Sequence, residues 1–180
     1  MINTDFKLTR KNFSHLLLLA VIFFIALAFP KDAHAETAAV AAKKISALFV
    51  RSNPRLSKNN ADLYARLAVA AAVRFKQNPY VVAALIVNES TVKYNAVSKG
   101  GDYGLMQIHW KAHSMTVAKR YGIKKPSGLF NPRINIYYGT EILANCNKRA
   151  KGNFDKTILY YSSGNKKLVT KVKRTMATIK

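Results

Sequence analysis

One glutamate, Glu89, closes an apolar segment in the middle of the chain and is the best candidate for acid–base chemistry. The segment at 78–89 reads NPYVVAALIVNE, and its apolar residues recur at helical spacing. A carboxyl group at its end lies in dry surroundings and near the negative end of a helix dipole, and both conditions disfavour the charged form. We therefore expect a raised pKa, so that Glu89 keeps its proton near neutral pH and acts as a general acid.

A glycine-rich stretch follows this glutamate and has the composition of a ligand-binding wall. Residues 100–108 read GGDYGLMQI. The glycines let the backbone pass close to a bound ligand, while Met106 and Gln107 supply apolar and amide contacts. This composition suits the wall of a sugar-binding cleft.

Four short motifs, in this order, resemble those of the lytic transglycosylases related to goose-type lysozyme, a family that cleaves peptidoglycan. The motifs are Glu89-Ser90, Gly104-Leu105-Met106-Gln107-Ile108, the segment NPRINIYYGT at 131–140, and Tyr161-Ser162-Ser163-Gly164. The resemblance covers about residues 78–164. It implies an α+β, predominantly helical lysozyme-like domain with a small loop or short-strand patch beside the catalytic helix.

The resemblance also implies a role for each matching residue. Glu89 is the catalytic residue, Ser90 hydrogen-bonds near the acid or the substrate, and the Tyr161 hydroxyl orients Glu89. Ser162 departs from the asparagine that the family carries at this position. The residues expected to bind substrate are Gly104, Leu105, Met106, Gln107, Asn135, Tyr138 and Ser162.

In the family, one glutamate suffices for the reaction, and the resemblance implies the same here. Glu89 acts first as an acid on the glycosidic oxygen of the MurNAc-GlcNAc β-1,4 bond and then as a base on the muramic-acid 6-hydroxyl. The product is a 1,6-anhydromuramoyl end, and the wall opens locally. No cofactor and no metal is expected, because His109 and His113 lack both a third ligand and the glutamate of a zinc-hydrolase motif.

Asp102 keeps a second enzymatic interpretation open. The run from Asp102 to Ile108 also resembles the run of animal-type lysozymes in which the aspartate is catalytic, and a lysozyme-like muramidase would hydrolyse the bond with Glu89 and Asp102. In the transglycosylase route, Asp102 gives catalytic support as an electrostatic helper or only shapes the loop. A third hypothesis is a non-catalytic peptidoglycan-binding assembly factor of a transenvelope machine, for which Ser162 is the only hint.

Start and stop signals predict the helices that must position these residues. We expect helices over 36–50, from Asn59 or Asn60 to 75, from Asn78 to Glu89 and over 114–121. A further helix should start at Asn131, and a short one, capped by Asp155, should extend to Tyr161. Residues 94–104 should form a loop with at most a short strand pair. The basic segment 166–180 is a last helix, a membrane-surface contact or a frayed tail.

Three single residues carry narrower expectations. Gly139, inside a predicted helix, costs ~1 kcal/mol relative to alanine and so indicates close packing against a neighbouring backbone. Trp110 either stacks on a sugar or covers the core. Cys146 is the only cysteine, so no intrachain disulfide forms, and a buried, unreactive thiol is expected.

The first 35 residues have the pattern of a signal peptide. Basic residues precede an apolar run at 16–29, and Ala33-His34-Ala35 has the A-x-A form of a cleavage site. The run has 14 residues, fewer than the ~20 that a membrane-spanning helix needs. We expect a periplasmic or secreted bacterial protein in which residues 36–180 form one transglycosylase domain with a core at about 61–165; an uncleaved anchor is the alternative.

The chain is strongly basic, with 30 Lys and Arg against 8 Asp and Glu. Loss of residues 1–35 would leave 26 against 6, a net charge near +20. Such a charge attracts cell-wall carboxylates, anionic wall polymers and, weakly, an anionic membrane surface. No zinc-finger spacing or aromatic RNA-binding signature indicates a specific nucleic acid. The small size is similar to that of specialised transglycosylases of secretion or conjugation systems, so a component of such an apparatus is an expected partner of a monomer.

Overall fold

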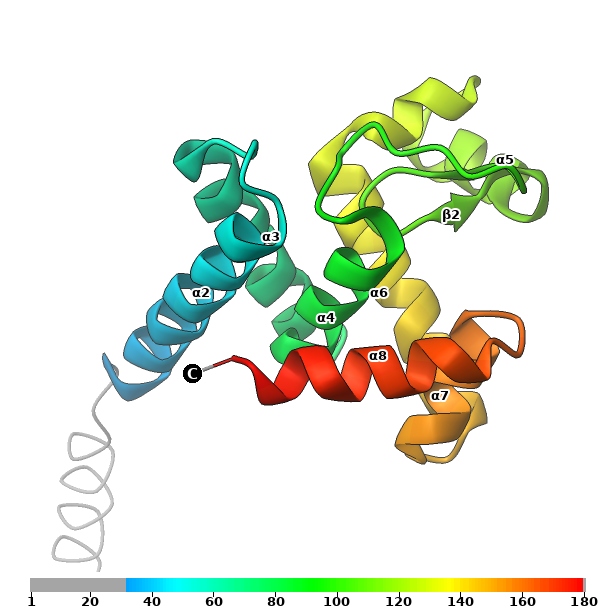
Figure 1. Ribbon diagram of the computed structural model, residues 1–180. Coiled ribbons are helices and arrows are strands. Elements are labelled where there is room, and N and C mark those ends of the chain that lie inside the picture. The colour runs from blue at the N-terminus through cyan, green and yellow to red at the C-terminus, as the bar shows by residue number, and fades with distance from the viewer. Residues whose placement is uncertain (1–31, 180) are drawn as a thin grey trace, which may run out of the picture. The chain divides into compact units, whose positions relative to one another are not determined.

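The computed structural model describes residues 32–179, with side chains from Ala38 onward, and this part is mainly helical (Figure 1). Two short antiparallel strands, β1 (Asp102–Tyr103) and β2 (Ile108–His109), form the sheet, and η1 (Pro126–Phe130) is a 3-10 helix. The seven α-helices of the described part are α2 (Asp32–Ser52), α3 (Lys58–Arg74), α4 (Pro79–Ser90), α5 (Trp110–Tyr121), α6 (Pro132–Arg149), α7 (Phe154–Tyr161) and α8 (Lys166–Ala177). The predicted α+β, predominantly helical class with a small strand patch is confirmed.

The predicted signal peptide stays a prediction. Residues 1–31 of it lie outside the described part of the chain, and residues 32–35 form the first turn of α2. Within residues 32–179, no helix combines the length and the apolar character that crossing a membrane would require.

Two asparagine caps begin the helices that matter most for the site, as the sequence predicts. The side-chain oxygen of Asn78 accepts a hydrogen bond from the Tyr80 N–H at 2.8 Å, and Pro79 occupies the first turn of α4. Asn131 caps α6 in the same way, with the Arg133 N–H at 3.0 Å. Such caps satisfy backbone donors that a helix start otherwise leaves without partners.

Four other predicted helix starts were wrong. Helix α2 begins at Asp32, four residues before the predicted 36. Ser57 caps α3, so Asn60 already lies in its first turn and donates its N–H to the Ser57 hydroxyl. Asn153 caps α7, and Asp155 instead pairs with Lys173 from within the first turn. Helix α5 starts four residues before the predicted 114, directly after β2 and without a side-chain cap. In α3 and α7 several residues capable of capping stand within a few positions, and local sequence does not choose between them.

Helix α4 is the centre of the main core. Its residues from Val82 to Ile86 are consecutive and completely buried, so the helix is covered on all sides. Helices α3 and α8 pack against it, and α6 packs against α3 and α7. Figure 1 shows α8 running beside α4. The basic segment after residue 166 is therefore a packed helix whose buried side carries Leu168 and Val172.

A second, smaller core lies under the strand pair. It consists of Ile108, Val117, Ile123, Leu129 and Tyr138. The Trp110 side chain packs on this cluster and does not line the cavity described below. Of the two expectations for Trp110, the structure supports that of a core cover.

Gly139 of α6 confirms the predicted close packing but not the predicted neighbour. A Cβ atom at this position would lie 2.7 Å from both Cβ and Sδ of Met106. Non-bonded atoms do not approach a Cβ atom this closely. The neighbour is thus a side chain rather than a backbone. Any larger residue at 139 would displace Met106 from the core.

The chain leaves α4 through two residues with left-handed backbone. Thr91 has φ of 50° and Val92 has φ of 56°, which are unfavourable for β-branched residues. Val92 is buried and anchors the turn, whereas Thr91 is exposed. The strained backbone thus lies directly after the helix that carries Glu89.

Thr91→Gly is expected to stabilise the protein. Glycine adopts the left-handed C-cap conformation without the Cβ penalty, and no buried contact is lost, so we expect a gain of about 0.5–1 kcal/mol after the entropy of the unfolded glycine is counted. Thermal or urea unfolding measures it. Thr91→Ala, which keeps the Cβ atom, is the control; equal stability of the two variants would contradict the strain argument.

Candidate active site

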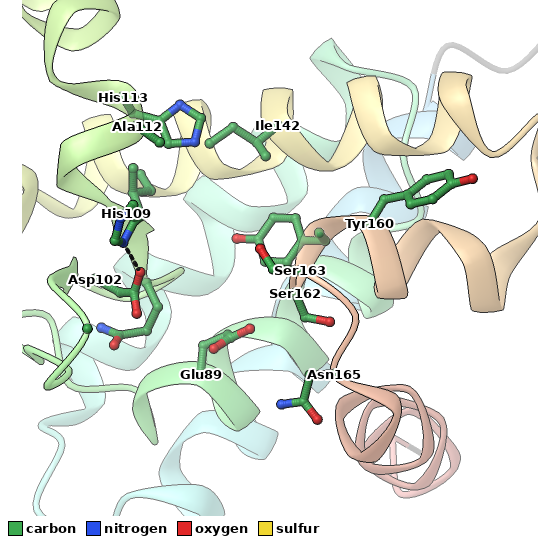
Figure 2. Close-up of a pocket in the computed structure, with 14 residues that line it drawn as sticks. Glu89, Asp102, His109, Ala112, His113, Ile142, Tyr160, Ser162, Ser163 and Asn165 are labelled. Atoms are coloured by element: carbon green, nitrogen blue, oxygen red, sulfur yellow. Dashed lines mark hydrogen bonds and ion pairs between the residues drawn. The ribbon is translucent and has the colours of Figure 1, made fainter.

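A cavity of about 550 Å³ opens beside the end of α4 and gathers most of the reactive side chains (Figure 2). Helix α4 supplies Glu89, and the strand pair supplies Asp102 and His109, while Ser162 and Asn165 come from the chain between α7 and α8. Figure 2 shows the Asp102–His109 pair on one side of Glu89 and Ser162 and Asn165 on the other. The remaining lining residues are Gly100, Gln107, Ile108, Ala112, His113, Ile142, Tyr160, Tyr161 and Ser163.

Glu89 sits half-buried in the last turn of α4. Burial and, to a smaller extent, the negative charge of Asp102 raise the pKa of its carboxyl group to about 7, and Lys171 opposes the shift. Burial and charge account for this shift, with no hydrogen bond from a described residue among its causes. The predicted raised pKa of Glu89 is confirmed, with the charge of Asp102 as a cause that the sequence did not reveal. Near neutral pH the Glu89 carboxyl group can therefore hold a proton and donate it.

Asp102 is held by two partners. Its Oδ1 lies 2.9 Å from Nδ1 of His109, and its Oδ2 accepts a hydrogen bond from the Ser98 hydroxyl at 2.6 Å (Figure 2). The carboxylate therefore has a fixed orientation in the same cavity as Glu89. Both of its oxygens are already occupied, which suits an electrostatic role better than nucleophilic attack. Within residues 32–179, no three His, Cys, Asp or Glu side chains are grouped so that they could hold a metal ion.

The Tyr161 hydroxyl has a different partner from the predicted one. It donates a hydrogen bond to the backbone carbonyl of Met106 at 2.7 Å, and burial raises its pKa well above the usual range. A buried hydroxyl needs an acceptor, and this carbonyl supplies it. Tyr161 lines the cavity next to Glu89 but is bonded to the cavity wall, so any effect on Glu89 comes through packing and position.

Ser90 is not brought to the cavity. Its side chain is buried and its hydroxyl donates back to the carbonyl of Ile86 at 2.9 Å, one helical turn earlier. This is the ordinary local bond of a serine inside a helix. The expected hydrogen bond near the acid or the substrate is thus replaced by a structural one.

Of the four residues at 104–107 that were expected to bind substrate, one lines the cavity and three do not. Gln107 lines the cavity and is fixed by its side-chain N–H bond to the Gly104 carbonyl at 2.9 Å. Leu105 and Met106 are completely buried in the main core and do not reach a ligand. Gly104 has φ of +81°, and a Cβ atom there would overlap the Asn135 amide, so glycine is required for packing.

Asn135, expected to bind substrate, is a buried clamp. Its Oδ1 accepts the Met106 N–H at 2.8 Å, and its Nδ2 donates to the carbonyls of Tyr103 at 2.8 Å and Leu129 at 2.9 Å. One side chain of α6 thus fixes both the strand pair and η1. Tyr138, also expected to bind substrate, is buried, and its hydroxyl lies 2.9 Å from Nδ1 of His113. It borders a neighbouring groove, not the cavity of Glu89.

Several cavity residues were not singled out from the sequence. They are His109, His113, Ser163 and Asn165, none of which was assigned a role in the site. His109 and Asn165 directly follow recognised motifs, Ser163 lies within one, and His113 follows His109 by four residues in α5. Tyr160 also belongs to the cavity lining and is 39% exposed. Proximity to a motif was the available signal, since a short hairpin or helix end carries its neighbours to the same place.

Comparison with known families finds a match over most of this domain. A family model described as "Transglycosylase SLT domain" matches residues 66–180, a range that includes Glu89 and every other residue lining the cavity. No curated protein and no solved structure matches the chain.

Proposed function

Because the chain belongs to the family of the transglycosylase SLT domain, we propose that it is a peptidoglycan lytic transglycosylase in which Glu89 is the catalytic residue. It cleaves the MurNAc-GlcNAc β-1,4 bond and leaves a 1,6-anhydromuramoyl end. The observation that carries the proposal is the half-buried Glu89 carboxyl group, which lines an open cavity and has a pKa of about 7. Such a group can give up a proton and take one back at the same pH.

The proposed reaction needs only this one titrating group. Protonated Glu89 donates its proton to the glycosidic oxygen as the bond from that oxygen to C1 of MurNAc breaks. The substrate's own N-acetyl group stabilises the cationic centre at C1. Ionised Glu89 then takes the proton of the C6 hydroxyl while O6 bonds to C1, so the proton returns to Glu89 and no water is consumed. Asp102 supports both stages by keeping negative charge near the cavity.

Mass spectrometry of digested sacculi tests the proposal against its alternatives. Purified sacculi are incubated with the mature protein, and the released muropeptides are analysed. Anhydro ends support the transglycosylase, whereas reducing ends would indicate a muramidase that uses Glu89 and Asp102. Binding to sacculi without any release would indicate a non-catalytic peptidoglycan-binding assembly factor.

Asp102→Asn is expected to move the high-pH limit of activity downward. Without the negative charge of Asp102, the pKa of Glu89 falls, so the acid loses its proton at a lower pH. The rate of the variant should therefore equal the wild-type rate at pH 5 and fall below the wild-type rate at pH 7 to 8. The measurement is the rate of anhydromuropeptide release against pH. A loss of about 10²-fold or more at every pH would instead favour hydrolysis with Asp102 as a second catalytic carboxylate.

The setting of the activity is also part of the proposal. An export signal over residues 1–35 would carry the domain to the periplasm or outside the cell, where peptidoglycan lies. There it would open the wall locally for a secretion or conjugation apparatus. Expression of a fusion to a reporter that is active only after export tests the first step.

A further inference from the structure

Two cations and an aromatic ring form a shelf at the edge of the Glu89 cavity. We name Arg149, Tyr160 and Lys166 the basic shelf. The Arg149 guanidinium carbon lies 4.2 Å from the centre of the Tyr160 ring, and Tyr160 is also one of the residues that line the cavity. A groove of about 450 Å³ is lined by all three shelf residues and shares Tyr160 and Ser163 with the cavity. The shelf is therefore continuous with the place where the proposed chemistry occurs.

The cations of the shelf are not neutralised by acidic residues of the described part of the chain. From residue 38 to 179, Asp62, Asp102, Glu141 and Asp155 each pair with another basic residue or histidine, and Glu89 lies in the cavity. Stacking on Tyr160 uses one face of the Arg149 guanidinium and leaves its N–H edge available. Such an edge matches a carboxylate with two parallel hydrogen bonds.

We propose that the basic shelf binds a carboxylate of the peptide attached to the MurNAc residue in the cavity, so that the enzyme prefers peptide-bearing glycan strands. This inference rests on the proposed function, because peptidoglycan is the ligand. The peptide leaves MurNAc sideways through its lactyl group and ends in free carboxylates. Since sugar and peptide are parts of one molecule, a glycan held in the cavity keeps the carboxylate at high local concentration beside the shelf. Even exposed ion pairs then add measurable affinity.

Binding to two matched ligands tests the proposal. The mature protein carrying Glu89→Gln, which blocks cleavage, is titrated with soluble peptide-bearing strands and with the same strands after an amidase has removed the peptides. Arg149→Gln and Lys166→Gln should each weaken binding of peptide-bearing strands about threefold, and the double variant about tenfold. Binding of bare strands should not change. The difference should shrink in high salt, because the cations are exposed.

Two neighbouring cations provide the matched control. Lys148 and Lys167 are exposed and adjacent to the shelf residues in the chain, but neither lines the cavity or the groove. Lys148→Gln with Lys167→Gln makes the same change in net charge and should leave both affinities unchanged. If this control lost as much affinity for peptide-bearing strands as the shelf variants, the cause would be general attraction to an anionic polymer, and the proposal that the basic shelf binds the peptide carboxylate would be overturned.

Two further results would overturn the inference in distinguishable ways. If the protein bound peptide-bearing and bare strands equally well, and the shelf variants weakened both or neither, peptidoglycan would remain the ligand and only the shelf assignment would fail. If it bound neither kind of strand, the proposed function would fail together with the shelf.

Discussion

Glu89→Gln is expected to reduce peptidoglycan cleavage roughly 10³-fold while leaving the binding of glycan strands unchanged, since glutamine has the shape of glutamate but no proton to donate. Release of anhydromuropeptides from sacculi measures the first effect, and co-sedimentation with sacculi measures the second. Glu141→Gln is the matched control. Glu141 pairs with Arg120 and does not line the Glu89 cavity, so this variant should keep its activity.

The same substitution is expected to increase stability at alkaline pH. The Glu89 carboxyl has a pKa of about 7 in the folded protein and 4.5 as its reference value. Below pH 4.5 the group is protonated in both states. Between pH 4.5 and about 7 the unfolded chain is ionised while the folded protein keeps the proton, so the folded protein loses stability as the pH rises, by up to about 3 kcal/mol above pH 7.

Glutamine removes this loss, so the variant should be more stable than wild type at pH 8 and similar to it at pH 4. Urea unfolding at both pH values makes the measurement. Full activity of Glu89→Gln would end the assignment of the acid. A stability difference that did not vary with pH would end the argument that Glu89 is held in a protonated state.

Asn135→Ala is expected to lower the free energy of unfolding by about 3–5 kcal/mol. The substitution leaves three backbone groups without partners: the buried N–H of Met106, the buried carbonyl of Leu129 and the half-buried carbonyl of Tyr103. An unsatisfied buried polar group costs about 1–3 kcal/mol, and partial relaxation reduces the sum. The cavity left by the side chain adds to the loss. Urea or thermal unfolding measures the change.

Asn131→Ala is the matched control for this experiment. Asn131 is an exposed residue of the same type, one helical turn earlier, and it only caps α6, so its loss should cost about 1 kcal/mol. The sequence-based expectation for Asn135 was substrate binding. If Asn135→Ala unfolded at the wild-type urea concentration but bound glycan weakly, that expectation would be right and the clamp would be wrong.

The sequence predicted the elements whose signals are local. Asn78 and Asn131 each precede a proline and start α4 and α6, since a cap and a fixed φ act within one turn. The sequence also placed Glu89, Asp102, Gln107 and Ser162 together, and all four line one cavity. It did not identify the partners of residues that act over long distances in the chain.

Asn135 and Tyr161 show why those partners were missed. Asn135 bonds a residue 29 positions away, and Tyr161 bonds one 55 positions away. A sequence motif indicates that a residue of this type occurs at this position, but it does not indicate which atom the side chain contacts. Residues that hold the wall of a site and residues that touch a ligand therefore look the same in one sequence, and only burial separates them.

The backbone of Met106 is held from two directions. Its N–H is donated to Asn135 of α6, and its carbonyl accepts the Tyr161 hydroxyl of α7. In solution, the Met106 amide proton should therefore exchange with deuterium only when the domain opens globally. The exchange rate of this one amide proton, measured by NMR, would therefore report whether the cavity wall is still folded in a given variant. It can be measured in each variant before a change in activity is interpreted.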